Sequence, residues 1–322
     1  TPYVAYTDYS VGVGSAYVMK LKDGTWVRVG SSAASPGSGA YAQIAISSKD
    51  SLFLAFSDGN VSNKTSVMKF DGTNWTFVGS QGFTSASKAG SNFGISNQDT
   101  LYFGHGGSGS SFYVYKFNGN SWNHVGPSTG ATAGDCYDPI MKISPSGTPF
   151  IAFADDNNGE EKASVRKFNG TSWEYVGKAE FSDDIVYRLD FDVINDTNAF
   201  IVFNDESISD RNTVMGYNGT KWTTVINKGV SSGQSGANAI EVAANGTIYL
   251  AYTDNGNAQK ATFKSPGVYS EIFGTDTAAF AKQNGNVVLT AENSNGCSAT
   301  DTVLVKESPN MLLTATAIQA NL

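Results

Sequence analysis

The sequence predicts an all-β fold made of repeated four-stranded sheets, and three observations lead to this prediction. One phrase, which reads Lys69-Phe70-Asp71-Gly72 and then Trp75 and Val78-Gly79 in its second copy, returns five times in related forms. A near-continuous apolar run precedes each copy. The 322 residues include 35 Gly and 12% aromatic residues but only 16% charged ones, which suits many short strands joined by tight turns.

Each repeat is predicted to form four strands. The first is short, as in 43–46, and the second is an apolar run, as in 51–58, that is typical of a strand buried on both faces. The third covers segments such as 66–69, and the fourth carries the Trp. The Asn/Asp-Gly pair between the last two predicts a type I′ hairpin turn, in which both residues have positive φ.

Four antiparallel strands in a repeat of about 49 residues are the unit of a β-propeller. Six blades are expected, because the second strand or its degenerate form recurs six times, ending at Asp8, Asp58, Gly107, Asp155, Asp205 and Asp254. The chain begins at a second strand, so we expect a C-terminal strand at 278–282 to complete the first blade and close the ring. The alternative is a seven-bladed ring, since 284–291 can be laid over 245–252.

The predicted domains follow from this count. Residues 1–284 form the propeller, and 285–322 form a C-terminal β tail that is either a partial module or the last blade of a seven-bladed ring. The five Trp are interpreted as structural residues of the repeat that pack against the next blade, namely Trp26, Trp75, Trp122, Trp173 and Trp222.

Charge and hydropathy exclude several classes of function. The net charge is −8, and only four Arg are present, so no basic stripe for nucleic acid is expected. No apolar run approaches 18 residues, so no membrane insertion is predicted. The two Cys, Cys136 and Cys297, leave the disulfide question open.

No catalytic residue is assigned. The Asp/Asn-Gly-x-x-Trp phrase differs from the sialidase Asp-box by one residue, and the scattered Arg do not suit the three-Arg carboxylate grip of those enzymes. The acidic stretch 155–161 makes Asp155, Asp156 and Glu160 weak candidates for a Ca²⁺ site, with a solvated loop as the simpler interpretation. No other cofactor is expected. The Asp that ends each second strand is predicted to accept backbone N–H groups of the following turn.

Two resemblances rest on these motifs. The repeat over about 1–274 resembles the propeller repeats of large secreted and surface proteins of Bacteroidota, for which display or adhesion is the usual inference. Residues 293–305 are similar to the closing hairpin of Ig-like, polycystic-kidney-disease-type modules, and such proteins often leave the cell by type IX secretion. The resemblance implies a secreted or cell-surface location and other modules of a larger protein as partners.

The sequence thus predicts a non-catalytic binding or adhesion module that recognises a glycan or a protein on a propeller face. A structural spacer of a large adhesin, with no ligand of its own, is the first alternative. A polysaccharide hydrolase or lyase is the remote one. The loop aromatics Tyr9, Tyr41, Phe83 and Tyr137 share no register, which favours one irregular site or none.

Overall fold

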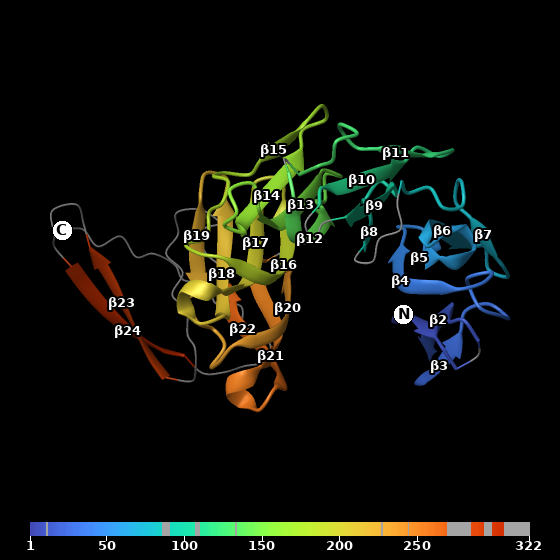
Figure 1. Cartoon of the computed structure of the whole chain (residues 1–322). Coiled ribbons are helices and arrows are strands. Elements are labelled where there is room, and N and C mark those ends of the chain that lie inside the picture. The colour runs from blue at the N-terminus through green and yellow to red at the C-terminus, as the bar shows by residue number, and fades with distance from the viewer. Residues whose placement is uncertain are drawn as a thin grey trace.

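The protein is a six-bladed β-propeller (Figure 1). The computed structural model describes residues 1–268, apart from 11, 86–90, 107–109, 133, 227 and 244, together with the backbone of 285–292 and 298–305. Within these residues the only helices are three short 3-10 turns. No described helix has the length and apolar character needed to span a membrane.

Each blade is an antiparallel sheet whose strands follow one another in chain order. Blades 2 to 5 have four strands. They are β4 (Gly39–Ile46), β5 (Leu52–Asp58), β6 (Lys64–Phe70) and β7 (Trp75–Phe77); β8 (Ser91–Ile95), β9 (Leu101–Gly106), β10 (Phe112–Phe117) and β11 (Trp122–His124); β12 (Cys136–Ile143), β13 (Pro149–Asp155), β14 (Lys162–Phe168) and β15 (Trp173–Tyr175); and β16 (Val186–Asn195), β17 (Asn198–Asp205), β18 (Arg211–Asn218) and β19 (Trp222–Ile226).

Blades 1 and 6 each show three strands. Blade 1 consists of β1 (Tyr3–Asp8), β2 (Ser15–Lys22) and β3 (Thr25–Arg28), which are the second to fourth strands of the repeat. Blade 6 consists of β20 (Ser235–Val242), β21 (Thr247–Asp254) and β22 (Lys260–Val268), which are the first to third. The strand predicted at 278–282 to close the ring lies outside the described residues.

The alternative of seven blades is wrong. The strands β23 (Gly285–Glu292) and β24 (Ser298–Val305) pair with each other and form a separate two-stranded sheet (Figure 1). The segment that was laid over a second strand of the repeat therefore joins no blade sheet. The Ig-like character of this tail stays a prediction.

The first strands of successive blades are neighbours in space. Strand β4 lies beside β1 and β8, β12 lies beside β8 and β16, and β16 lies beside β20. In blades 2, 4, 5 and 6 this strand begins earlier in the chain than predicted. A bulge in each of them interrupts the pairing with the second strand. Tyr41, Asp138 and Arg188 lie at these bulges with positive φ values of 47 to 54°. The bulge shifts the alternation of side chains, which hides the first half of the strand from a periodicity search.

The apolar cores lie between the blades. In the second strand of blade 2, Leu54 and Phe56 pack toward blade 1, whereas Ala55 packs toward Phe103 of blade 3. Ala152 and Ala154 pack toward Phe191 of blade 5 in the same way. Small and bulky residues thus alternate on a strand that is buried on both faces, as the apolar runs predicted.

The turn before each Trp differs from the prediction in four blades. In blade 1 both Asp23 and Gly24 have positive φ, as a type I′ turn requires. In blade 2 the pair Phe70–Trp75 is closed by four residues, of which Gly72 alone has positive φ. The Asp71 carboxylate accepts the N–H groups of Thr73 and Asn74, at 2.8 and 2.7 Å. The side chain therefore stabilises this wider turn, and the Asn of the other copies does the same.

Candidate functional site

Four of the five Trp connect consecutive blades. The indole N–H of Trp122 donates to the carbonyl of Val78 in the preceding blade at 2.8 Å. Trp75, Trp173 and Trp222 make the equivalent bond to Val29, Val125 and Val176, at 3.3, 2.8 and 2.7 Å. Each of these indoles thus contacts the blade that precedes it in the chain, so the predicted packing against the next blade is wrong in direction. The Val of the Val-Gly pair supplies the acceptor.

The Gly of this pair leaves room for the ring. At Gly126, φ is +85°, and an added Cβ would lie 2.8 Å from Nε1 of Trp173. Gly79 and Gly177 also have positive φ and would meet Trp122 and Trp222. The whole phrase is therefore explained by contacts that hold the blades together.

Trp26 differs from the other four. Its side chain is 45% exposed, whereas Trp173 is 5% exposed. Trp26 lies in blade 1, the first blade that the structure describes, and the contact to a preceding blade that the other four make is not seen for it among the described residues.

The Asp that ends each second strand caps the following turn. Asp8, Asp58, Asp155, Asp205 and Asp254 each accept the backbone N–H two residues on. This confirms the predicted turn role. Asp58 is fully buried, and its second oxygen also accepts from Ser66 Oγ and Gln81 Nε2, both at 2.8 Å.

The candidate Ca²⁺ ligands do not converge. Asp155 is buried, and its second oxygen accepts the hydroxyl of Tyr175 at 3.0 Å. Glu160 forms an ion pair with Lys162 at 2.6 Å, and Asp156 joins neither of these interactions. Among the described residues no group of three or more His, Cys, Asp or Glu is arranged to hold a metal ion.

A group of charged residues lies on the first strands of blades 4, 5 and 6. Lys142 is 3.8 Å from Asp192 and 3.9 Å from Glu241. Burial raises the pKa of Asp190, and burial followed by the charge of Asp192 raises the pKa of Glu241. Raised carboxyl pKa values are also found in acid–base active sites.

Two of these carboxylates hold neighbouring strands together. Asp190 accepts the N–H of Ile240 and Asp192 that of Val242, both at 2.7 Å. Because one oxygen of each carboxylate is fixed on the backbone of β20, we interpret the pair as links between blades 5 and 6.

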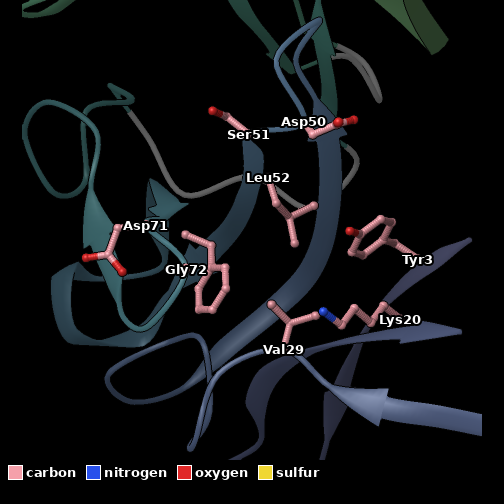
Figure 2. Close-up of a pocket in the computed structure, with 9 residues that line it drawn as sticks. Tyr3, Lys20, Val29, Asp50, Ser51, Leu52, Asp71 and Gly72 are labelled. Atoms are coloured by element: carbon pink, nitrogen blue, oxygen red, sulfur yellow. The ribbon is translucent and has the colours of Figure 1, made fainter. Parts of the chain in front are cut away.

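A cavity of about 290 Å³ opens between blades 1 and 2 (Figure 2). We call it the first pocket. Its apolar lining comes from Tyr3 and Val29 of blade 1 and from Leu52 and Phe70 of blade 2, and its polar lining consists of Lys20, Asp50, Ser51 and Asp71. The exposed lining of this pocket is mostly polar, which suits a ligand with hydroxyl groups.

A second cavity, of about 670 Å³, lies at the equivalent place between blades 2 and 3. We call it the second pocket. The pairing registers establish the equivalence, since Tyr3 lies opposite Lys20 in blade 1 as Phe53 lies opposite Lys69 in blade 2. The second pocket is lined by Phe53, Lys69, Val78, Asp99, Thr100, Leu101, Lys116, Phe117, Asn118 and Gly119. The blade repeat therefore builds the same kind of pocket twice.

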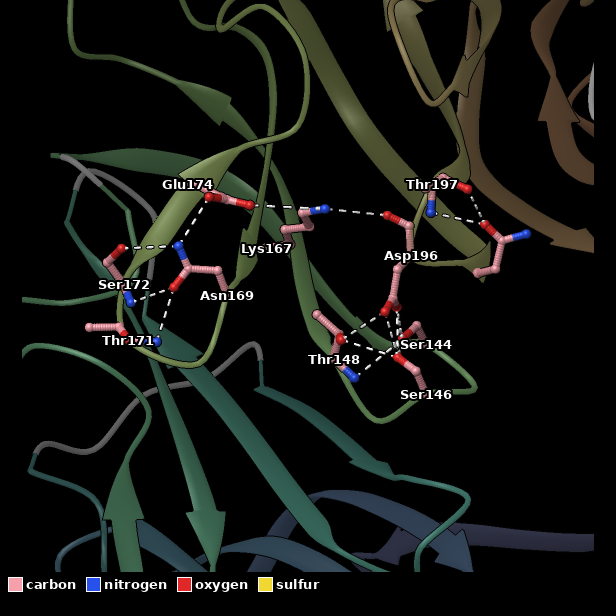
Figure 3. A network of polar contacts seen from close by, with 11 residues as sticks. Ser144, Ser146, Thr148, Lys167, Asn169, Thr171, Ser172, Glu174, Asp196 and Thr197 are labelled. Atoms are coloured by element: carbon pink, nitrogen blue, oxygen red, sulfur yellow. Dashed lines mark hydrogen bonds and ion pairs between the residues drawn. The ribbon is translucent and has the colours of Figure 1, made fainter.

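The corresponding loops are linked across the next junctions. The hydroxyl of Tyr102 donates to the carbonyl of Gly147 in blade 4 at 3.3 Å. Between blades 4 and 5, the carboxylate of Asp196 accepts from the hydroxyls of Ser144, Ser146 and Thr148 (Figure 3). Burial opposes ionisation of Asp196, but the three hydroxyls and the charge of Lys167 lower its pKa overall.

The pocket residues were not predicted as a site. Their signal was present, because the repeated phrase carries a Lys at positions 69 and 116, and Lys20 lies in the matching segment of the first repeat. The sequence does not reveal that the loop of the next blade faces this Lys, since each pocket needs two blades. Tyr9, in the turn after β1, and Tyr41 are exposed but line neither pocket. Tyr41 and Tyr137 were wrongly expected in loops, since they lie in β4 and β12.

Known structures share the fold. An ulvan lyase, a polysaccharide lyase, is 14% identical with a TM-score of 0.52, and the match covers 80% of this chain and 70% of that one. A lectin of Aleuria aurantia in complex with Fucα1-6GlcNAc is 16% identical with a TM-score of 0.51, covering 82% and 87%. A prolyl endopeptidase is 12% identical with a TM-score of 0.53, covering 92% and 44%.

These likenesses establish the propeller fold, which is shared by lectins and enzymes. The sequence matches no protein-family model and none of the curated proteins compared with it.

Proposed function

We propose that this protein is a non-catalytic carbohydrate-binding module and that the first and second pockets are its sugar sites. The observation that carries the proposal is the repetition of one pocket design at two successive blade junctions. Aromatic and aliphatic side chains can cover the apolar face of a sugar ring, and the Lys, Asp and Ser or Thr groups can bind its hydroxyls.

Two sites of one design at successive blade junctions suit a polymeric ligand. A glycan chain that reaches both pockets binds the second one intramolecularly, so two weak sites together give a useful affinity. The structures of lectins with the same fold are consistent with this role. The interpretation of Asp190 and Asp192 as blade links supports a module without catalysis.

The proposal is tested by filling each pocket. Ser51→Tyr and Thr100→Tyr place a ring in the first and second pocket, and Val13→Tyr adds the same ring in the loop between β1 and β2. Val13 is 73% exposed and serves as the matched control. Glycan-array screening followed by calorimetry with the best oligosaccharide should show binding in the wild type and in Val13→Tyr. Each pocket variant should lose part of the binding, and the double variant should lose all of it.

Three results would contradict this assignment. Unchanged binding in the double variant would place the sugar site elsewhere. Binding to no glycan at high concentration would favour the spacer function. Release of reducing ends or unsaturated sugars from a polysaccharide would contradict the absence of catalysis.

We also propose that the module is secreted or displayed on a bacterial cell surface, where extended glycans are accessible. The low Cys content and the Thr-, Ser-, Asn- and Gly-rich composition support this location. Fractionation of the source cells with an antibody against the propeller tests it. Recovery of the protein in the cytoplasm alone would contradict the proposal.

A further inference from the structure

We infer that the second pocket selects acidic glycans, which carry a uronate carboxylate or a sulfate ester, whereas the first pocket binds neutral sugars. This inference rests on the proposed function and adds the ligand class. It follows from a difference in free charges between two pockets that share one design.

The second pocket contains two ammonium groups. Lys69 and Lys116 both line it and are exposed. Nζ of Lys69 lies 5.6 Å from the ring centre of Phe53, and Nζ of Lys116 lies 5.7 Å from that of Tyr102. The Nζ atom of neither Lys forms an ion pair or hydrogen bond with another described residue. Both ammonium groups therefore keep their N–H donors for a ligand.

The carboxylate of Asp99, which lines the second pocket, already accepts two hydrogen bonds from the protein. Asp99 accepts the backbone N–H of Ser48 at 2.7 Å and its hydroxyl at 2.8 Å, one on each oxygen. These two bonds also hold the pKa of Asp99 below its usual value. Asp99 thus has fewer free acceptor positions for the hydroxyls of a neutral sugar. The pocket offers mainly positive charge and donors.

The first pocket is more acidic. Lys20 is its one lysine, Asp50 occupies the position of Asp99, and Asp71 occupies the position of Asn118. Asp50 has no hydrogen bond or ion pair to its carboxylate within the described part of the chain. Figure 2 shows Asp50 and Lys20 on opposite sides of the pocket. One cation and two carboxylates suit hydroxyl groups, and an acidic ligand would face repulsion from Asp50 and Asp71.

The net charge of −8 makes the lysines necessary for this selectivity. The protein as a whole repels an anionic polymer at long range, and this repulsion is screened by salt. Direct contact with the two ammonium groups must therefore provide the attraction. A hydrogen bond to a charged group contributes about a tenfold change in affinity.

Binding of three matched probes tests the inference. The probes are a galacturonic acid trisaccharide, a sulfated galactan tetrasaccharide and neutral galactotriose. They are titrated into the full chain, into the double variant Lys69→Gln/Lys116→Gln, and into Lys22→Gln as the control, because Lys22 is exposed and lines neither pocket. All three lysines are solvent-accessible, and thermal unfolding should show the same midpoint for every variant.

We expect the double variant to lose at least about tenfold in affinity for one or both acidic probes and to keep its affinity for galactotriose. Lys22→Gln should leave the affinity for all three probes unchanged. The wild-type affinity for the acidic probes should fall with added salt. A preference for the sulfated probe over the galacturonate probe would assign the site to sulfate esters, and the reverse preference to uronates.

Two outcomes overturn the inference, and they differ in what they imply for the function. Glycan binding that is blocked by Ser51→Tyr or Thr100→Tyr but shows no dependence on Lys69 and Lys116 removes the acidic selectivity and leaves the carbohydrate-binding function intact. Failure of the wild type to bind any of the probes, or any glycan on the array, removes both.

Discussion

Gly126 offers a direct test of how the blades are held together. Replacing it with Ala places a methyl group 2.8 Å from Nε1 of Trp173, a distance that real Cβ atoms do not show. The indole would have to shift and lengthen its 2.8 Å bond to the carbonyl of Val125. Gly119→Ala is the matched control, since Gly119 also has positive φ (+96°) but has no atom within 4 Å of the added Cβ.

The two substitutions share one cost and differ in the other. Placing Ala in a left-handed backbone costs about 1–2 kcal/mol at either position. Overpacking against a buried ring adds about 1–3 kcal/mol at Gly126 alone. We therefore expect the free energy of unfolding to fall by about 1–2 kcal/mol in Gly119→Ala and by about 2–5 kcal/mol in Gly126→Ala.

Urea denaturation followed by tryptophan fluorescence and circular dichroism measures both values. The variant Trp173→Ala supplies the third corner of a double-mutant cycle, because its cavity accommodates the methyl group. In that background Gly126→Ala should cost no more than Gly119→Ala does in the wild type. Equal effects of the two glycine substitutions in the wild type would refute the idea that Gly126 is needed for the approach of the indole.

Three further predictions concern single side chains. Trp173→Ala should lower the free energy of unfolding by about 3–5 kcal/mol, and Trp26→Ala should lower it clearly less because the Trp26 side chain is 45% exposed. Denaturant melts of the two variants measure both losses, and equal losses would contradict the prediction. Burial raises the pKa of the Cys136 thiol to about 12, so iodoacetamide should label this thiol at pH 8.5 only after unfolding. Mass spectrometry of the Cys136 peptide detects the label, and fast labelling of the folded protein would disprove the prediction. Asp58→Ala should lower the free energy of unfolding by about 2–4 kcal/mol because it leaves three hydrogen-bond donors unpaired. Asp8→Ala removes one exposed turn contact and should change the melting midpoint little. A similar shift of the midpoint in both variants would refute the difference.

The architecture could be predicted because the repeat is visible in the sequence. A Trp that returns once per repeat, an apolar run before it and a Gly-containing turn are local patterns, and each corresponds to one strand or turn of a blade. The direction of the indole contact could not be predicted. Whether Trp122 bonds to the carbonyl of the preceding or the following blade depends on how two sheets pack, which a pattern within one repeat does not contain.

The bulges and the pockets were missed for physical reasons. Tyr41, Asp138 and Arg188 adopt positive φ although Tyr and Arg have no intrinsic preference for it, so tertiary packing imposes this backbone. Lys69 was visible as part of the repeated phrase, but its partner surface comes from Asp99 and Thr100 in the next blade. A site shared between two repeats becomes visible only when the repeats are placed side by side.

The hydrogen bond from Trp to the Val carbonyl has a donor in the later blade and an acceptor in the earlier one. The contact therefore has a direction along the polypeptide, because in each described pair the donor is C-terminal to its acceptor. The blade synthesised first therefore supplies the carbonyl acceptor, and the blade synthesised after it supplies the indole donor. Deleting a later blade would leave a carbonyl of the earlier one without its donor, whereas deleting an earlier blade would leave an indole N–H without its acceptor.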